Sequence, residues 1–424
     1  MLNKYYLCID LKTFYASVEC VLRGLDPYKT KLVVADPSRG NGAITLAVSP
    51  YMKELGVKNR GRIFEIPKNI DYIVAIPQMK KYMEYSAKIY SIYLRYIAKE
   101  DIYPYSIDEM FLDITTYLKL YKTTPEKLAK ALMNKIYEEL GLPSACGIGT
   151  NLFLTKVALD ITAKHSPDRI GFLDEEKFKK ELWDHQPLSD FWQIASGIEK
   201  RLNKLGIYTM RDLSKANEDV LYREFGINAE ILIDHANGIE PVTIKDIKNY
   251  KNKSHSISQS QILFSDYSKK DARLALTEMV EILSLQLVEK GLVTSNIGLS
   301  IGYSKDKHKP TGGSMKLTIC TNVYTKLLPY FLELFDRTTD EETLIRRIGI
   351  SFNNVVSEDL EYLDLFTNPE EVIKERKLEK TIIDLKKKFG KNSVLKAMNL
   401  SEGATTIKRN KLIGGHNAER EDAD

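Results

Sequence analysis

Cysteine is scarce in this chain and poorly placed for cross-linking. Its 424 residues include four cysteines, far apart and without a C-x-x-C spacing: Cys8, Cys20, Cys146 and Cys320. Because disulfide and zinc frameworks need regularly spaced cysteines, both are excluded, and we expect the reduced thiols of a cytosolic protein.

Long apolar runs and a strong net charge are also absent. No run is long enough to cross a bilayer, and the first twelve residues lack the layout of a signal peptide, so we expect a cytoplasmic protein with no membrane partner. The formal net charge is +4, which by itself indicates no class of partner. The length predicts about three domains.

One short acidic stretch is the feature around which the chain is organised. Residues 105–109 (YSIDE) lie between β-rich runs at 102–105 and 110–114, which predicts a strand, a tight turn and a returning strand. Asp108 and Glu109 then stand side by side, where like charges repel. Most such pairs are solvated turn acids, and on the motif alone that alternative stays open.

A third carboxylate makes this pair a candidate metal site. Asp10 ends the apolar strand predicted at 5–9. If that strand lies beside the hairpin, three carboxylates converge on one edge of a sheet. Such hard oxygen ligands suit Mg²⁺, which completes its shell with water and substrate phosphates. Two such ions, about 3.5–4 Å apart, can hold the attacking and leaving oxygens of a phosphoryl transfer.

Hydrophobic periodicity predicts the remaining elements. In the first half we expect strands at 31–35, 43–48 and 144–149 and helices at 51–55, 78–99, 125–140 and 151–164. In the second half, strands at 256–264, 296–303, 315–321 and 344–355 are separated by helices at 271–290 and 325–335. A last helix begins at Asn368 and ends at Gly390, with Ile373, Leu378, Ile382, Leu385 and Phe389 on one side.

Two blocks that lie about a hundred residues apart, 8–19 (CIDLKTFYASVE) and 105–109, resemble the paired signature of Y-family DNA polymerases, the lesion-bypass enzymes. The closer likeness is to the branch that includes the catalytic subunit of bacterial DNA polymerase V and its mobile-element relatives, and it extends to about residue 355. It implies an α+β right-hand polymerase that performs translesion synthesis with low fidelity. No element suggests an exonuclease, so no proofreading is expected.

The resemblance implies a ferredoxin-like palm at 1–30 and 76–166, small fingers at 31–75 and a helix-hairpin-helix thumb at 167–240. A basic tether at 241–255, an α/β little finger at 256–356 and a C-terminal extension at 357–424 would follow. The lysine-rich tether could equally be a solvated linker. The tail from 401 mixes charges and glycines, which predicts disorder.

The same resemblance assigns the catalytic site. Asp10, Asp108 and Glu109 would bind two Mg²⁺ ions, with Leu11 contributing its backbone carbonyl. Tyr15 would be the steric gate, a ring under the sugar that leaves no room for a 2′-OH. The alternative for Tyr15 is an ordinary core aromatic.

Nucleotide contacts follow from the same match. Gly42 and Ala43 would lie against the nascent base pair, and Lys53 and Lys164 would meet the triphosphate. Two departures accompany these lysines: Ser49-Pro50 replaces a residue that is often Tyr or Asn, and one extra residue separates Lys164 from Lys156. A solvated helix lysine is the competing interpretation of Lys53.

DNA and protein partners are implied as well. The hairpin around Gly197 and Lys200 would bind a DNA phosphate, although Glu199 replaces the usual second glycine and a purely structural hairpin is nearly as good an explanation. The basic residues Lys253, Lys305 and Lys307 would add phosphate contacts. Residues 362–366 (YLDLF) resemble the peptide that docks on the sliding clamp, with Leu363, Leu365 and Phe366 as contacts.

The leading hypothesis is therefore a template-directed DNA polymerase that uses deoxynucleoside triphosphates and primer-template DNA. The sequence leaves open the need for an accessory activating subunit. One alternative is a non-catalytic DNA-binding scaffold, which would require the loss of a metal acid. Another is a two-metal nucleotidyltransferase or cyclase with a similar palm, although the thumb-like hairpin favours a long nucleic acid.

Overall fold

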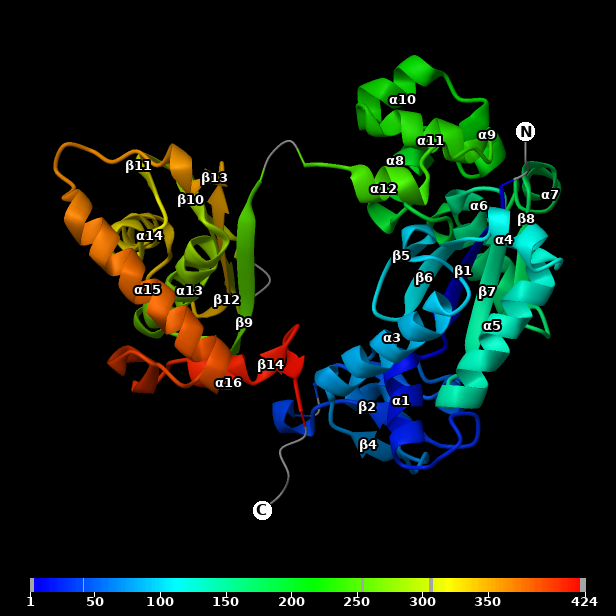
Figure 1. Ribbon diagram of the computed structural model, residues 1–424, viewed down its shortest axis with the longest axis horizontal. Coiled ribbons are helices and arrows are strands. Elements are labelled where there is room, and N and C mark those ends of the chain that lie inside the picture. The colour runs from blue at the N-terminus through cyan, green and yellow to red at the C-terminus, as the bar shows by residue number, and fades with distance from the viewer. Residues whose placement is uncertain (1–3, 41, 253–254, 305–307, 420–424) are drawn as a thin grey trace. The chain divides into compact units, whose positions relative to one another are not determined.

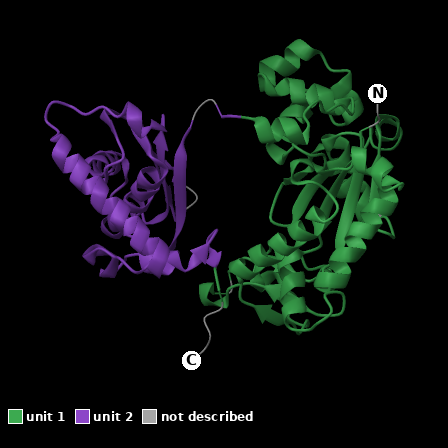
Figure 2. Cartoon of the chain, in the orientation of Figure 1, with its two compact units in different colours: residues 1–250, 418–424 green, residues 251–417 purple. Residues whose placement is uncertain are grey.

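The computed structural model describes residues 4–40, 42–252, 255–304 and 308–419. The chain divides into two compact units, residues 1–250 with 418–424 and residues 251–417, which are coloured separately in Figure 2. The finer boundaries of palm, fingers and thumb stay predictions.

A five-stranded sheet of order β5-β6-β1-β7-β8 forms the centre of the first unit (Figure 1). Its middle strand β1 (Tyr6–Leu11) pairs antiparallel with β6 (Glu109–Asp113) and β7 (Ser144–Gly149). β5 (Ile102–Pro104) and β8 (Ile170–Leu173) are the edges. The predicted first strand, acidic hairpin and strand at 144–149 are therefore confirmed.

Side-chain alternation along β1 decides which residues reach the site. Tyr6 and Cys8 point to the face on which Leu152 and Leu159 pack, so Asp10, two residues further on, belongs to that face. Helix α5 (Pro125–Leu140) contacts β1, β7 and β8, and it also packs against α3 (Met79–Leu94). Both helices lie within the spans predicted for them.

The first unit has a second, small sheet of order β3-β2-β4. Its strands are β3 (Ala47–Val48), β2 (Leu32–Val34) and β4 (Ile73–Ala75). The strand predicted at 43–48 is shorter, because only its last two residues pair with β2, whereas Ile44 makes a single bridge to Arg62. The helices α1 (Phe14–Leu22) and α2 (Pro50–Glu54) precede and follow this sheet's first two strands.

Short helices make up the rest of the first unit. They are α4 (Thr115–Leu120), α7 (Glu175–Glu181), α8 (Ser196–Lys204), α9 (Met210–Ser214), α10 (Glu218–Phe225), α11 (Asn228–Ala236) and α12 (Ile244–Asn249). The last one corrects the expectation of an exposed tether. The side chain of Ile244 is buried with Tyr6 and Phe111, and the Lys248 ammonium donates to the carbonyls of Lys99 and Glu100, so residues 244–249 are docked on the sheet.

The second unit is built on a sheet of order β11-β10-β12-β9. Its strands are β9 (Ile257–Tyr267), β10 (Leu292–Tyr303), β11 (Thr311–Thr321) and β12 (Ile345–Asn353), with β13 (Val356–Ser357) beside β10. The helices α13 (Lys269–Lys290) and α14 (Tyr324–Thr338) share one core with them. All four predicted strands and both helices are confirmed.

The tail that was predicted to be disordered is folded where the structure describes it. Residues 397–417 form a 3₁₀ turn, α16 (Thr406–Asn410) and the hairpin β14 (Leu412–Ile413) and β15 (His416–Asn417). The fully buried carboxylate of Glu278 accepts hydrogen bonds from the Asn399 amide (2.9 Å) and from the backbone and hydroxyl of Thr405 (2.7 and 2.9 Å). A buried charge that is satisfied in this way fixes the segment.

The helix α15 (Pro369–Phe389) has the predicted length but buries a different side. Val372, Glu379 and Ile383 are buried, whereas Ile373, Leu378, Leu385 and Phe389 of the predicted apolar side are exposed. No helix in the described ranges is long and apolar enough to cross a bilayer. The four cysteines are buried free thiols.

Glycines in β7 and β8 let the chain after β7 lie directly on the sheet. A Cβ added at Gly147 would lie 2.1 Å from the carbonyl oxygen of Thr155, and one at Gly171 would lie 2.5 Å from that of Ala158. Both distances are far inside van der Waals contact, so any side chain would push the segment 152–165 away from the sheet.

We therefore expect Gly147→Ala to lower the stability of the first unit by about 3 kcal/mol through overpacking. The control is Gly197→Ala, since a Cβ there meets nothing within 4 Å and alanine should stabilise helix α8 by up to about 1 kcal/mol. Thermal unfolding followed by circular dichroism measures both. Equal melting midpoints for the two variants would contradict the packing argument.

Candidate active site

The register of β1 and β6 brings the predicted acids together. Asp10 lies directly opposite Glu109 in the antiparallel pair, and the backbone amide of Leu11 donates to the carbonyl of Asp108 (3.0 Å). Asp108 itself is in the turn, where its carboxylate accepts from the Ser106 hydroxyl (2.7 Å). Three carboxylates therefore meet at one end of the β1–β6 strand pair.

Their closeness has an electrostatic cost. Burial, and then the carboxylates of Asp108 and Glu109, raise the pKa of Asp10 to about 7. A divalent cation would relieve this repulsion, and the all-oxygen donor set suits Mg²⁺. Among the described residues, no three acid, cysteine or histidine side chains are already arranged around one point, so metal binding requires these side chains to turn.

Glu109 is engaged by a lysine that the sequence argument did not assign to the site. The Lys156 ammonium lies 2.7 Å from Oε1 of Glu109 and 3.0 Å from Oδ2 of Asp160, and the Cys8 thiol donates to the same Oε1 (2.9 Å). Burial works against the ammonium, but Glu109 and Asp160 outweigh it, so the pKa of Lys156 is raised. The only sequence signal was its position four residues before Asp160.

The helix predicted at 151–164 changes type in its middle. It is α-helical in α6 (Leu152–Val157), π-helical over Ala158–Thr162 and 3₁₀ to His165. A π-turn accommodates an extra residue in a helix, which matches the extra residue noted between Lys156 and Lys164. Lys164 remains half-exposed, and its ammonium lies 3.3 Å from Oδ1 of Asp160, so this one carboxylate contacts both lysines.

Tyr15 lies beside the acids in the first turn of α1. It is the one partly exposed residue in the stretch 14–20, and its ring packs on Tyr82 with centroids 4.7 Å apart. Burial, and then the charge of Asp108, raise the pKa of its hydroxyl. The partly exposed ring is therefore supported by a second aromatic ring, and its role as a steric gate stays a prediction.

Cations also gather near Asp10. Burial lowers the pKa of Lys12, and the charges of Arg169 and Lys53 lower it further, which places these groups within electrostatic range of one another. Lys12 and Arg169 were not predicted. Lys53 is exposed on α2, whereas the Ser49 hydroxyl caps that helix (3.3 Å to the Met52 amide) and donates to the Thr30 carbonyl (2.6 Å). The Ser49 hydroxyl therefore both donates and accepts a hydrogen bond within the protein.

The other predicted contacts are scattered. Gly42 is exposed, with its carbonyl bonded to Arg62 (2.7 Å), and Ala43 is buried. Gly197 and the exposed Lys200 lie in the first turns of α8, where Glu199 turns its carboxylate to the Ser189 amide (3.2 Å). The predicted DNA contacts Lys253, Lys305 and Lys307 lie outside the described residues. Leu363 is partly exposed, and Leu365 and Phe366 are 100% and 95% exposed.

The ion pair of Lys156 generates a stability prediction. Lys156→Met leaves Glu109 and Asp160 without their buried partner, which should cost about 3–5 kcal/mol. Lys164→Met is the matched control on the same helix, and because its side chain is 53% exposed it should change stability by less than about 0.5 kcal/mol. Thermal melts without added metal measure both. A Lys156→Met melt like that of the control would refute the structural role.

The family comparisons agree with this geometry. The model of the impB/mucB/samB family matches residues 9–160, and the model of its C-terminal domain matches residues 254–365. The chain is 32% identical to the putative UV-damage repair protein UvrX of Bacillus subtilis (strain 168) over 98% of both chains. It is 30% identical to DNA polymerase IV 2 of the same organism over 98% of this chain and 99% of that protein.

Among solved structures, the Y-family DNA polymerase chimera Dbh-Dpo4(243-245)-Dbh has a TM-score of 0.63 and 22% identity, with 83% of this chain and 99% of that chain covered. This likeness shows the fold, a right-hand polymerase of mixed helix and sheet. Two family models that together match more than half of the chain show the family. The chain belongs to the impB/mucB/samB family and hence to the Y-family DNA polymerases.

Proposed function

We propose that this protein is a template-directed DNA polymerase for translesion synthesis, which adds deoxynucleotides to a primer 3′-OH without proofreading. The observation that carries the proposal is the meeting of Asp10, Asp108 and Glu109 at one end of the β1–β6 strand pair, with Lys12, Lys53 and Lys164 nearby. Acids with cations within electrostatic range of them suit a metal-bound triphosphate.

The three acids, with the Leu11 carbonyl, would hold two Mg²⁺ ions. When bound, the metal lowers the pKa of the attacking hydroxyl and neutralises charge on the leaving phosphate. The protein's own groups would position the reactants and screen their charge. Lys156 holds the Glu109 carboxylate through their ion pair, and Lys53 and Lys164 would contact phosphate oxygens. Gly42 and Ala43 would face the nascent base pair, where small side chains leave space for damaged bases.

Primer extension tests this proposal directly. The purified chain should extend a primer on an undamaged template with Mg²⁺ and four deoxynucleotides, and then across an abasic site. Asp108→Ala with Glu109→Ala should lower extension by at least a thousandfold, or about 4 kcal/mol, while primer-template binding persists. Binding without extension by the wild-type chain would favour the non-catalytic scaffold or an accessory activating subunit.

The steric gate gives a second test in the same assay. Removing the ring in Tyr15→Ala should raise ribonucleotide incorporation about 100-fold relative to deoxynucleotides, which corresponds to ~2.7 kcal/mol of lost discrimination. Tyr15→Phe keeps the ring and should discriminate like the wild type. If Tyr15→Ala discriminates equally well, Tyr15 is only a core aromatic.

We also propose that residues 362–366 dock on the sliding clamp. The Cys320 amide donates to the Tyr362 carbonyl (2.8 Å) and the Thr367 hydroxyl to Asp364 (2.7 Å). The first bond joins the start of the peptide to β11, and the second closes a local turn in which Leu365 and Phe366 are exposed. Exposed pairs of large apolar residues mark interaction sites.

Leu365→Ala with Phe366→Ala should therefore weaken binding to a bacterial sliding clamp at least tenfold in surface plasmon resonance. Leu378→Ala, another exposed leucine in the same unit (59%), should leave it unchanged. Equal binding by both variants would remove this peptide as the docking site.

A further inference from the structure

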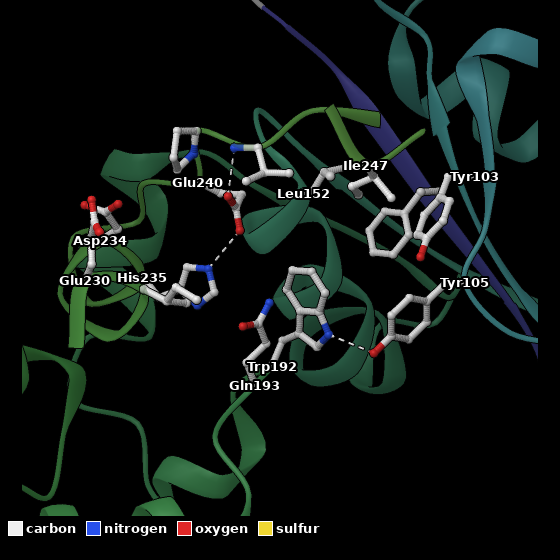
Figure 3. Close-up of a pocket in the computed structure, with 14 residues that line it drawn as sticks. Tyr103, Tyr105, Leu152, Trp192, Gln193, Glu230, Asp234, His235, Glu240 and Ile247 are labelled. Carbon is white, nitrogen blue, oxygen red and sulfur yellow. Dashed lines mark hydrogen bonds and ion pairs between the residues drawn. The ribbon is translucent and has the colours of Figure 1, made fainter. Parts of the chain in front are cut away.

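A cavity of about 460 Å³ is lined by Tyr103, Tyr105 and Phe111 of the acidic hairpin and by residues of α6, α11 and α12. Figure 3 shows its walls, which come from the β5–β6 hairpin, from Trp192 and Gln193, from α11 and from the segment before α12. This volume is within the range of sites that bind small organic molecules. None of the proposed polymerase contacts lines it.

One wall of the cavity is aromatic and rigid. The ring of Trp192 packs on Phe111 and Tyr105, with centroid distances of 6.0 Å for each pair, and its indole N–H donates to the Tyr105 hydroxyl (3.1 Å). The neighbouring Gln193 has a left-handed backbone with φ of 69°. Such strain in a residue other than glycine is common at ligand sites.

Carboxylates are the charged groups of the cavity, and the Gln193 amide and the hydroxyls of Tyr103 and Tyr105 also line it. Glu230, Asp234 and Glu240 line it, and Nε2 of His235 pairs with the Glu240 carboxylate at 3.0 Å. The His235 side chain is 1% exposed, and its Nδ1 has no hydrogen-bond partner in the described chain. In the neutral ring with its proton on Nε2, Nδ1 is an acceptor that no described group uses. The three carboxylates repel anions, which disfavours phosphates and DNA as occupants.

We propose that this cavity binds a small organic cation with a flat apolar body, such as an aromatic amidine or amine. The aromatic wall would cover the flat face and supply cation–π attraction. N–H groups of the cation would donate to the carboxylates of Glu230 and Asp234, for which no side-chain bond occurs among the described residues, and to Nδ1 of His235. The proposal is independent of the polymerase assignment.

Benzamidine is the probe, and benzamide, which has the same shape without the charge, is its control. The chain has two tryptophans, so an ¹H–¹⁵N spectrum shows two indole signals, which Trp183→Phe assigns. Trp192 lines the cavity, whereas the indole of Trp183 donates to the Ala236 carbonyl (2.8 Å) and does not. Benzamidine should shift the Trp192 signal saturably, and benzamide should bind at least tenfold more weakly.

Glu230→Gln with Asp234→Asn should weaken benzamidine binding at least tenfold. Glu218→Gln with Asp219→Asn, which neutralises two acids on the neighbouring helix α10, should not. No saturable shift at 10 mM probe, equal shifts of both indole signals, or equal affinity for benzamide would each overturn the proposal. Unchanged binding in the first double variant would do the same.

Discussion

The proposed metal site depends on one constraint, that Asp10 and Glu109 on neighbouring strands stand together with Asp108 in the adjacent turn. Burial, and then the repulsion from Asp108 and Glu109, raise the pKa of Asp10, and the repulsion has to be balanced by positive charge. The protein supplies part of this charge itself, because Lys156 bonds Glu109 at 2.7 Å. In the proposed function, bound metal would supply the remaining positive charge.

The position of Lys156 requires small residues in the neighbouring strand of the sheet. Lys156 reaches Glu109 only because α6 lies directly on β7, and this closeness requires Gly147 and Gly149, whose added Cβ atoms would lie 2.1 and 2.4 Å from backbone atoms of Thr155. Past this contact, the π-turn keeps both Lys156 and Lys164 within bonding distance of Asp160. Gly147 and Gly149, which have no side chains, thus determine where Lys156 lies relative to Glu109.

Much of this arrangement could be predicted from the sequence, and the failures have physical causes. The acidic hairpin and the four long strands of the second unit were found because alternation and turn residues are local signals. The π-turn was not, since apolar spacing over a single turn does not separate an i+4 bond from an i+5 bond. Lys156 was missed as a site residue because its partner Glu109 is distant in the chain.

The tail shows why composition alone misled. Its glycines and mixed charges predict disorder only if no partner satisfies its backbone, and that partner, Glu278, lies more than 100 residues earlier on α13. A fully buried carboxylate is unfavourable without several donors, so the helix and the tail each stabilise the other's polar groups. The same reasoning applies to α12, where Ile244 is a sufficient apolar anchor for a lysine-rich segment. A few long-range hydrogen bonds or one buried apolar side chain can therefore fix a segment whose average composition predicts disorder.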